Sequence, residues 1–293
     1  MKTAFVFPGQ GSQFVGMGRS WAEKYLAWAG EILGFDLKKV VLEGPEEELK
    51  KTEIQQPAIF TISAAAYDRL KTKEQRAKIV AGHSLGEYSA LYAAEAISFE
   101  DGVRIVHLRG KFMQEAVPEG QGAMTAILGG DKETIIEICQ EVGRVWPANF
   151  NSPGQVVISG EKSAVETASE KLKKAGAKKI VPLAVSAPFH CPLMQTAADK
   201  LKIELEKIVL KDPQIPLVAN VTANYVFKAT EIKELLIRQV TSPVLWEDSV
   251  KKMVNDSVTH FVEVGPGKVL CGLIKKIASE VEAKTFEELE VEV

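Results

Sequence analysis

The sequence has few cysteines, little net charge and no long apolar run. Its three cysteines among 293 residues, Cys139, Cys191 and Cys271, lack the spacing of a disulfide framework or a metal clamp. The formal net charge of −3 gives no positive excess for binding nucleic acid. No stretch approaches the roughly 18 apolar residues of a membrane span. These absences predict a cytoplasmic protein that holds no metal and binds neither nucleic acid nor membrane.

What is present is the composition of an ordinary globular protein, with 46% hydrophobic and 26% charged residues. At about 150 residues per domain, the length predicts two domains, or one large domain with an insertion. In most of the chain, helical patterns alternate with short apolar strands, which are expected at residues 3–7, 78–81, 217–220 and 260–264.

A middle segment has a different pattern, with the order strand, helix, strand, strand, helix, strand, which is typical of ferredoxin-like domains. We therefore expect a small ferredoxin-like α+β domain over residues 118–187. It would be inserted into a large α/β-hydrolase-like catalytic domain with a parallel sheet, made of residues 1–117 and 188–293.

Three further expectations concern residues outside the candidate site. Pro57 is expected to start a helix that runs to about Leu70. His107 shares a helix face with Arg104 and other charged residues, so that face is expected to be solvated. The acidic end of the chain, from about Glu280, is expected to be a solvated helix or a frayed tail.

A candidate nucleophile lies in the sequence Gly-His-Ser-Leu-Gly at residues 82–86, which fits the pattern G-x-S-x-G. An expected strand precedes the pattern and a helix follows it, as in a nucleophile elbow, where the serine occupies a sharp turn. The N-terminus of the helix would favour negative charge developing near Ser84. The alternative is that Ser84 merely caps this helix.

A serine nucleophile needs a base, and four histidines are available: His83, His107, His190 and His260. His83 is next to the serine and is expected to point elsewhere, whereas His260 opens a strand and is expected to be structural. His190 lies in a loop with a proline two residues away on either side. A histidine held in a rigid loop between domains suits a general base, although a local hydrogen bond would also explain it.

Arg109 is expected within the apolar stripe of its helix. Ile105, Phe112, Met113 and Ala116 fall on the same helical face. A permanently charged guanidinium is costly to bury without an anion. Arg109 must therefore pair with a protein carboxylate, extend to solvent, or bind an acidic ligand. The last possibility predicts a substrate carboxylate that is held bidentately.

With these residues in place, the sequence resembles the malonyl-CoA:acyl carrier protein transacylases of bacterial fatty-acid synthesis. The resemblance covers almost the whole chain, and its motifs are specific in combination. Besides His190, they are FVFPGQGSQ at 5–13, GHSLGEY at 82–88, LRGKFMQ at 108–114, NFNSPGQ at 149–155 and EVGPGKVL at 263–270.

The resemblance implies covalent ping-pong transfer. Ser84 would attack the malonyl thioester while His190 takes its proton, and the phosphopantetheine thiol of holo acyl carrier protein would then attack the malonyl-serine ester. Backbone N–H groups of Gln10 and Leu85 would stabilise the oxyanion, and Arg109 would bind the malonyl carboxylate. Malonyl-CoA and acyl carrier protein are substrates, so no cofactor is expected. The family also implies a monomer.

The resemblance assigns three further residues. Phe189, directly before His190, is associated with a choice of malonyl over methylmalonyl groups in related polyketide acyltransferases. The family's base is generally held by a backbone carbonyl, often that of a glutamine just before a tryptophan. Here Leu245 precedes Trp246, so the Leu245 carbonyl is the candidate. Asn151, in the motif at 149–155, is a second candidate orienting residue.

The main alternative is a serine thioesterase or esterase with the same elbow and base. A non-catalytic module that docks carrier protein is a further alternative, and intact Ser84, His190 and Arg109 disfavour it. A nucleotide-binding enzyme is rejected because Phe14 and Val269 break the glycine-rich motifs that it would need. A metal-dependent hydrolase is rejected because the sequence lacks the clustered His or Asp ligands that such an enzyme needs.

Overall fold

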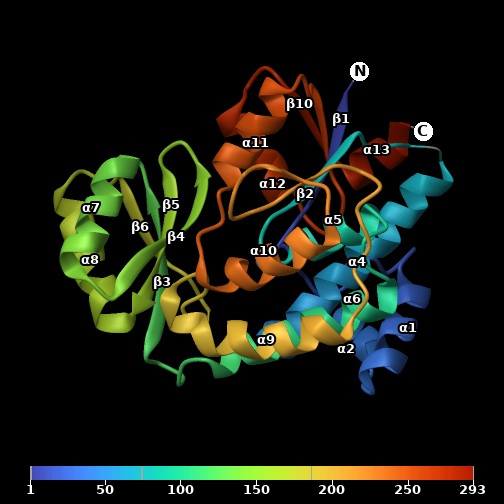
Figure 1. Ribbon diagram of the computed structural model, residues 1–293, viewed down its shortest axis with the longest axis horizontal. Helices are drawn as coiled ribbons and strands as arrows, with labels where there is room; N and C mark the ends of the chain where they lie inside the picture. Colours follow the sequence, from blue (N-terminus) through green and yellow to red (C-terminus); the bar gives the residue numbers. More distant parts are fainter. Residues whose placement is uncertain (1, 74, 186, 293) are drawn as a thin grey trace.

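The computed structural model describes residues 2–73, 75–185 and 187–292, and its strands form two separate sheets (Figure 1). The larger sheet has the order β10-β9-β1-β2-β7-β8. All neighbouring strands in it are parallel except β7 and β8. The strands are β1 (Thr3–Phe7), β2 (Ile79–Gly82), β7 (Leu217–Val218), β8 (Tyr225–Val226), β9 (His260–Glu263) and β10 (Glu282–Thr285).

Helices cover both faces of this sheet. Successive side chains of the central strand β1 point to opposite faces, and each face is buried in its own core. Phe5 and Phe7 belong to one buried cluster, and Ala4 and Val6 belong to the other. The helices of this part are α1 (Glu23–Leu33), α2 (Leu37–Glu43), α3 (Glu46–Leu49), α4 (Thr52–Thr72), α5 (Gly86–Ala93), α6 (Phe99–Glu115), α9 (Gln195–Lys207), α10 (Ala229–Thr241), α11 (Trp246–Asn255), α12 (Val269–Ile277) and α13 (Phe286–Glu292), with a short 3-10 turn at Pro192–Met194.

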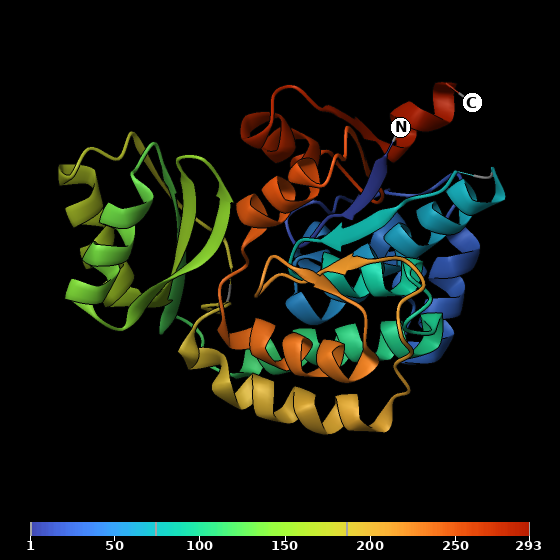
Figure 2. The same ribbon diagram turned by 45° about the horizontal axis from the view of Figure 1, so that its top comes forward.

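The smaller sheet is antiparallel, with the order β4-β5-β3-β6, and the element order expected between residues 118 and 187 is confirmed. One face packs against its own helices, and the opposite face, including Met124 and Val157, joins the core of the larger part (Figure 2). Its elements are β3 (Gly122–Leu128), α7 (Lys132–Val142), β4 (Val145–Ser152), β5 (Gln155–Glu161), α8 (Lys162–Lys174) and β6 (Lys179–Pro182).

Helix α4 begins at Thr52, so the expectation that Pro57 starts the helix is wrong. Proline has no N–H and leaves the carbonyl four residues earlier without its helical donor. That carbonyl belongs to Glu53, and it lies 2.8 Å from the Nδ1 atom of His107. His107 is therefore partly buried against α4, and not on a solvated face as expected.

The first part of the acidic C-terminal segment, β10, belongs to the sheet, and the rest forms helix α13, so the expectation of a solvated helix or frayed tail is wrong for the strand only. Strand β10 pairs in parallel with β9, and Ala283 lies opposite Phe261. Ala283 and Phe286 are buried, while the exposed Glu282 lies on the outer side. The acidic residues concealed this alternation. Among the described residues, no helix combines the length and apolarity needed to cross a membrane.

Candidate active site

Ser84 lies in a sharp turn between β2 and α5, and its backbone has a left-handed φ of 52°. Two flanking glycines make the turn possible. A Cβ on Gly82 would lie 1.9 Å from the backbone of Gly86, and a Cβ on Gly86 would lie 2.0 Å from the Phe7 carbonyl oxygen. No larger residue fits at either position. The expected strand–turn–helix setting of Ser84 is confirmed.

Asn220 holds this turn from the segment that follows the neighbouring strand β7. Its Oδ1 accepts a hydrogen bond of 2.7 Å from the Ser84 N–H, and its Nδ2 donates one of 2.6 Å to the Gly82 carbonyl. Sequence reasoning missed this residue. The available signal was a polar residue at the carboxyl end of an expected strand, the edge where α/β sheets gather functional groups.

The structure brings His190 directly onto Ser84, with 2.7 Å between Nε2 and Oγ. Both side chains are buried, and His190 also has a left-handed φ, of 59°. Its Nδ1 lies 2.8 Å from the Gln239 backbone carbonyl. Because a carbonyl can only accept, Nδ1 carries the proton and Nε2 is left to accept from the Ser84 hydroxyl.

Gln239, and not Leu245, supplies the carbonyl that orients His190. Gln239 lies in the last turn of α10, and the residue four positions later is Pro243, which has no N–H to occupy this carbonyl. The Leu245 carbonyl instead accepts hydrogen bonds from the backbone N–H and the hydroxyl of Ser249, at 2.9 and 2.7 Å. The expectation for Leu245 is therefore wrong. A glutamine four residues before a proline at a helix end was the missed signal.

Burial is the main cause and the positive charge of Arg109 the second cause that together lower the pKa of His190 to about 3. The imidazole is therefore neutral at neutral pH. A neutral Nε2 within hydrogen-bond distance of a hydroxyl can accept its proton.

Arg109 is fully buried on α6, on the apolar face expected for it. Its guanidinium donates to the Oε1 atoms of Gln56 and Gln239, both at 2.8 Å, and to Ser84 Oγ at 3.2 Å. Among the described residues no carboxylate forms an ion pair with it, and its Nε has no partner. Of the three possibilities, a contact ion pair with a protein carboxylate and extension to solvent are not observed.

Gln10 and Leu85 belong to two loops in close contact. A Cβ on Gly9 would lie 2.5 Å from the His83 carbonyl oxygen, and the His83 backbone N–H donates a hydrogen bond of 3.0 Å to the Phe7 backbone carbonyl. The loop after β1 therefore lies beside the Ser84 turn. In the described structure, neither the Gln10 nor the Leu85 backbone N–H has a protein acceptor.

The remaining expected residues lie around this centre. Phe189 is buried beside His190. Asn151 Oδ1 lies 2.8 Å from His83 Nε2, and among the described hydrogen bonds none joins Asn151 to His190. The His83 ring also packs edge-on against Trp246, at 5.7 Å between ring centroids, so His83 points away from the Ser84 hydroxyl as expected. Within the described residues no group of three or more His, Cys, Asp or Glu side chains could hold a metal ion.

Known proteins resemble this chain in sequence and in structure. The model of the acyl transferase domain family matches residues 4–289. Malonyl CoA-acyl carrier protein transacylase of Escherichia coli K12 is 50% identical, covering 97% of this chain and 96% of that protein. The Bacillus subtilis protein of the same name is 48% identical, covering 94% and 90%.

Solved structures agree with these relatives. An acyl carrier protein S-malonyltransferase from Vibrio cholerae superposes with a TM-score of 0.95 at 45% identity, covering 97% of this chain and 96% of that one. A type II PKS acyl-carrier protein in complex with its malonyl-transacylase also matches, with a TM-score of 0.95, 48% identity and the same coverages.

Proposed function

This chain belongs to the acyl transferase domain family, and on that premise we propose that it transfers malonyl groups from malonyl-CoA to acyl carrier protein. The observation that carries the proposal is the environment of Arg109. A buried cation that contacts the candidate nucleophile and has only neutral oxygen partners fits an acyl group that ends in a carboxylate.

In the first half-reaction Ser84 is the nucleophile and His190 is the base. Nε2 takes the hydroxyl proton as Oγ bonds to the thioester carbonyl carbon. The resulting tetrahedral oxyanion is stabilised by the free N–H groups of Gln10 and Leu85. The C–S bond then breaks, the proton passes from His190 to the departing CoA sulfur, and a malonyl ester remains on Ser84.

The second half-reaction runs the same steps with a new thiol. The phosphopantetheine thiol gives its proton to His190 Nε2, and its sulfur attacks the ester carbonyl carbon. The C–O bond to Ser84 breaks, and the proton passes to Oγ. Atoms and charge balance without a cofactor. The Gln239 carbonyl keeps Nδ1 protonated throughout, so that Nε2 is always the reacting nitrogen.

Specificity for the malonyl group comes from two sides of the site. Arg109 binds the free carboxylate. Phe189, buried next to His190, limits the space beside the acyl group and so disfavours a methyl branch. Asn151 acts indirectly, by holding His83 against Trp246 and away from the reacting atoms.

The finer architecture is proposed with the function. We divide the chain into a hydrolase-like catalytic domain, residues 1–117 and 188–293, and a ferredoxin-like domain, residues 118–187. Support for the second comes from its strand order, in which the first and third strands of the segment are central neighbours. The Ser84 site is complete within one chain, which is consistent with a monomer.

Intact-protein mass spectrometry after brief incubation with malonyl-CoA, without carrier protein, tests the function. We expect one added malonyl group, mapped to Ser84 and discharged by holo acyl carrier protein. Ser84→Ala should carry none, whereas the control Ser89→Ala, at a buried serine on the adjoining helix α5, should still load. Steady release of CoA and malonate with no adduct would instead identify a thioesterase.

A further inference from the structure

Glu87 is a buried acid that the reaction described above does not use. It is 1% exposed and lies in the first turn of α5, three residues after Ser84. Its Oε2 accepts hydrogen bonds from the Gln239 side-chain amide at 2.7 Å and from the Asn220 backbone N–H at 3.2 Å. Among the described residues no basic side chain forms an ion pair with it. A buried carboxyl without a cation partner is costly.

The Gln239 side chain connects Glu87 to Arg109. Its Nε2 donates to Glu87 Oε2 and to the Ser84 carbonyl, the latter at 3.0 Å, while its Oε1 accepts from Arg109 at 2.8 Å. Acceptors lie on one side of the amide and a donor on the other, so only this orientation satisfies every group. Glu87 is the acceptor nearest to Nε2.

The side-chain amide of Gln239 separates the guanidinium of Arg109 from the carboxyl of Glu87. Arg109 and Glu87 both contact Gln239 but not each other. A carboxylate in direct contact would occupy the guanidinium, and a substrate carboxylate would then have to displace it. An intervening amide fixes the guanidinium through a neutral oxygen and leaves the charge available. Burial raises the pKa of Glu87 to about 7, while the Gln239, Asn220 and Arg109 groups oppose that rise.

We propose that Glu87 is a positioning residue, which orients Arg109 through the side-chain amide of Gln239. Without an acceptor at position 87, the NH₂ group keeps only its longer contacts with the Ser84 carbonyl and Asn220 Oδ1, at 3.0 and 3.4 Å, so the amide is held less firmly and can rotate its NH₂ group toward Arg109. The guanidinium then loses an acceptor and faces a donor, so it shifts from its position beside Ser84. The inference rests on the proposed function, because it takes Arg109 as the group that binds the malonyl carboxylate.

The test compares acylation by malonyl-CoA with acylation by acetyl-CoA, which has no free carboxylate. Glu87→Met retains the length of the side chain but removes its acceptor oxygens. We expect its malonyl-to-acetyl ratio of kcat/KM to fall about tenfold, as for one lost hydrogen bond to a charged group. Glu87→Gln retains an acceptor oxygen and should recover most of the ratio.

A double-mutant cycle tests whether the effect passes through Gln239. Gln239→Met removes the amide but keeps the backbone carbonyl that holds His190, so it should lower the same ratio. In that background Glu87→Met should lower the ratio no further. Additive losses in the double variant, or equal losses for malonyl-CoA and acetyl-CoA, would overturn the proposal and show that Glu87 only stabilises the turn.

If Glu87→Met does not fold, Glu87→Asp takes its place, because it keeps the charge but withdraws the carboxylate from Gln239. A folded Asp variant with an unchanged ratio would contradict the proposal. If the wild-type chain fails to load malonyl onto Ser84, the proposed function itself fails. The acylation of the wild-type protein therefore separates the two.

Discussion

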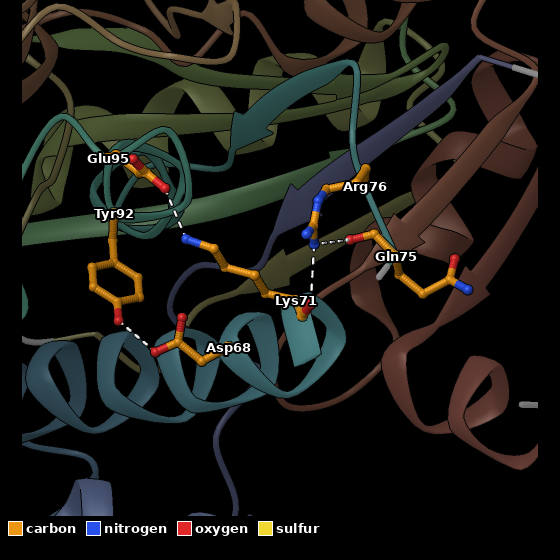
Figure 3. A network of polar contacts seen from close by, with 6 residues as sticks. All are labelled: Asp68, Lys71, Gln75, Arg76, Tyr92 and Glu95. Atoms are coloured by element: carbon orange, nitrogen blue, oxygen red, sulfur yellow. Dashed lines mark hydrogen bonds and ion pairs between the residues drawn. The ribbon is translucent and has the colours of Figure 1, made fainter. Parts of the chain in front are cut away.

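Two polar networks in the larger part of the molecule, around Ser84 and around Asp68, balance their charges differently. In the second, Lys71 pairs with Glu95 at 2.8 Å, and the two side chains are 46% and 57% exposed (Figure 3). Asp68 accepts a hydrogen bond of 2.6 Å from the Tyr92 hydroxyl. The lysine of this network thus has a carboxylate partner in contact with solvent.

The network around Ser84 is buried and leaves its cation without a carboxylate partner. Arg109 donates hydrogen bonds to the neutral side-chain oxygens of two glutamines, Gln56 and Gln239. The carboxyl of Glu87 accepts from the amide of Gln239 and is thereby separated from Arg109. Solvent screens the pair of Lys71 and Glu95, but it cannot screen Arg109. The exposed cation is thus balanced by a protein carboxylate, whereas the buried cation keeps a charge that the proposed substrate carboxylate would balance.

Removing the buried cation should produce the largest effect. We expect Arg109→Ala to lower kcat/KM for malonyl transfer about a hundredfold more than for acetyl transfer, because only malonyl loses a charged partner. Arg104→Ala is the matched control, since Arg104 is exposed on the same helix. Steady-state kinetics with both acyl-CoA substrates would measure the difference. Equal losses for the two would make Arg109 a purely structural residue.

The pH dependence of stability should separate the networks next. The folded-state pKa of His190, about 3, lies below its usual 6.5, so between these values the unfolded chain binds more protons. The stability that the neutral His190 contributes is therefore fully present above about pH 6.5 and is lost as pH falls through this window. At pH 5 the loss due to His190 is about 2 kcal/mol. Glu87, whose pKa is raised, changes stability with pH in the opposite direction. Because Glu87 is present both in the wild-type protein and in a His190 variant, the comparison between the two isolates the contribution of His190.

Urea unfolding at pH 7 and pH 5 would measure this difference. The wild-type protein should lose about 2 kcal/mol more between the two pH values than His190→Ala, in which the group is absent. The pKa of Glu95 is lowered from 4.5, mainly by its hydrogen bond with Lys71, so this carboxyl titrates below the range. Identical losses in both proteins would show that His190 is protonated in the folded state.

The sequence predicted the contacts of the Ser84 network that depend on local pattern. The G-x-S-x-G motif placed Ser84 on its turn, and helical periodicity placed Arg109 on a buried face. His190 was selected by elimination among four histidines. The signals for Ser84 and Arg109 lie within a few residues of each group, so packing between distant segments was not needed to read them. Elimination alone left a local hydrogen bond as an alternative for His190, whose contact with Ser84 spans 106 residues.

The residues that sequence reasoning missed depend on tertiary packing. Asn220 and Gln239 reach the turn from positions 136 and 155 residues beyond Ser84. Their contacts follow from the pairing of β2 with β7 and the placement of α10, which a single sequence does not specify. Leu245 was selected by its neighbour Trp246, although its carbonyl begins the hydrogen bonding of α11. The resemblance pointed to the right kind of group at the wrong residue.

Removing the exposed cation should have the smallest effect. We expect Lys71→Met, which keeps most of the aliphatic chain, to lower the free energy of unfolding by less than about 1 kcal/mol and leave malonyl transfer unchanged. High salt should reduce even that difference, because the pair with Glu95 is exposed and screened. Urea unfolding at low and high salt would measure both quantities. A loss that persists in high salt and exceeds about 2 kcal/mol is expected only of buried charges, and it would remove the distinction drawn between the two networks.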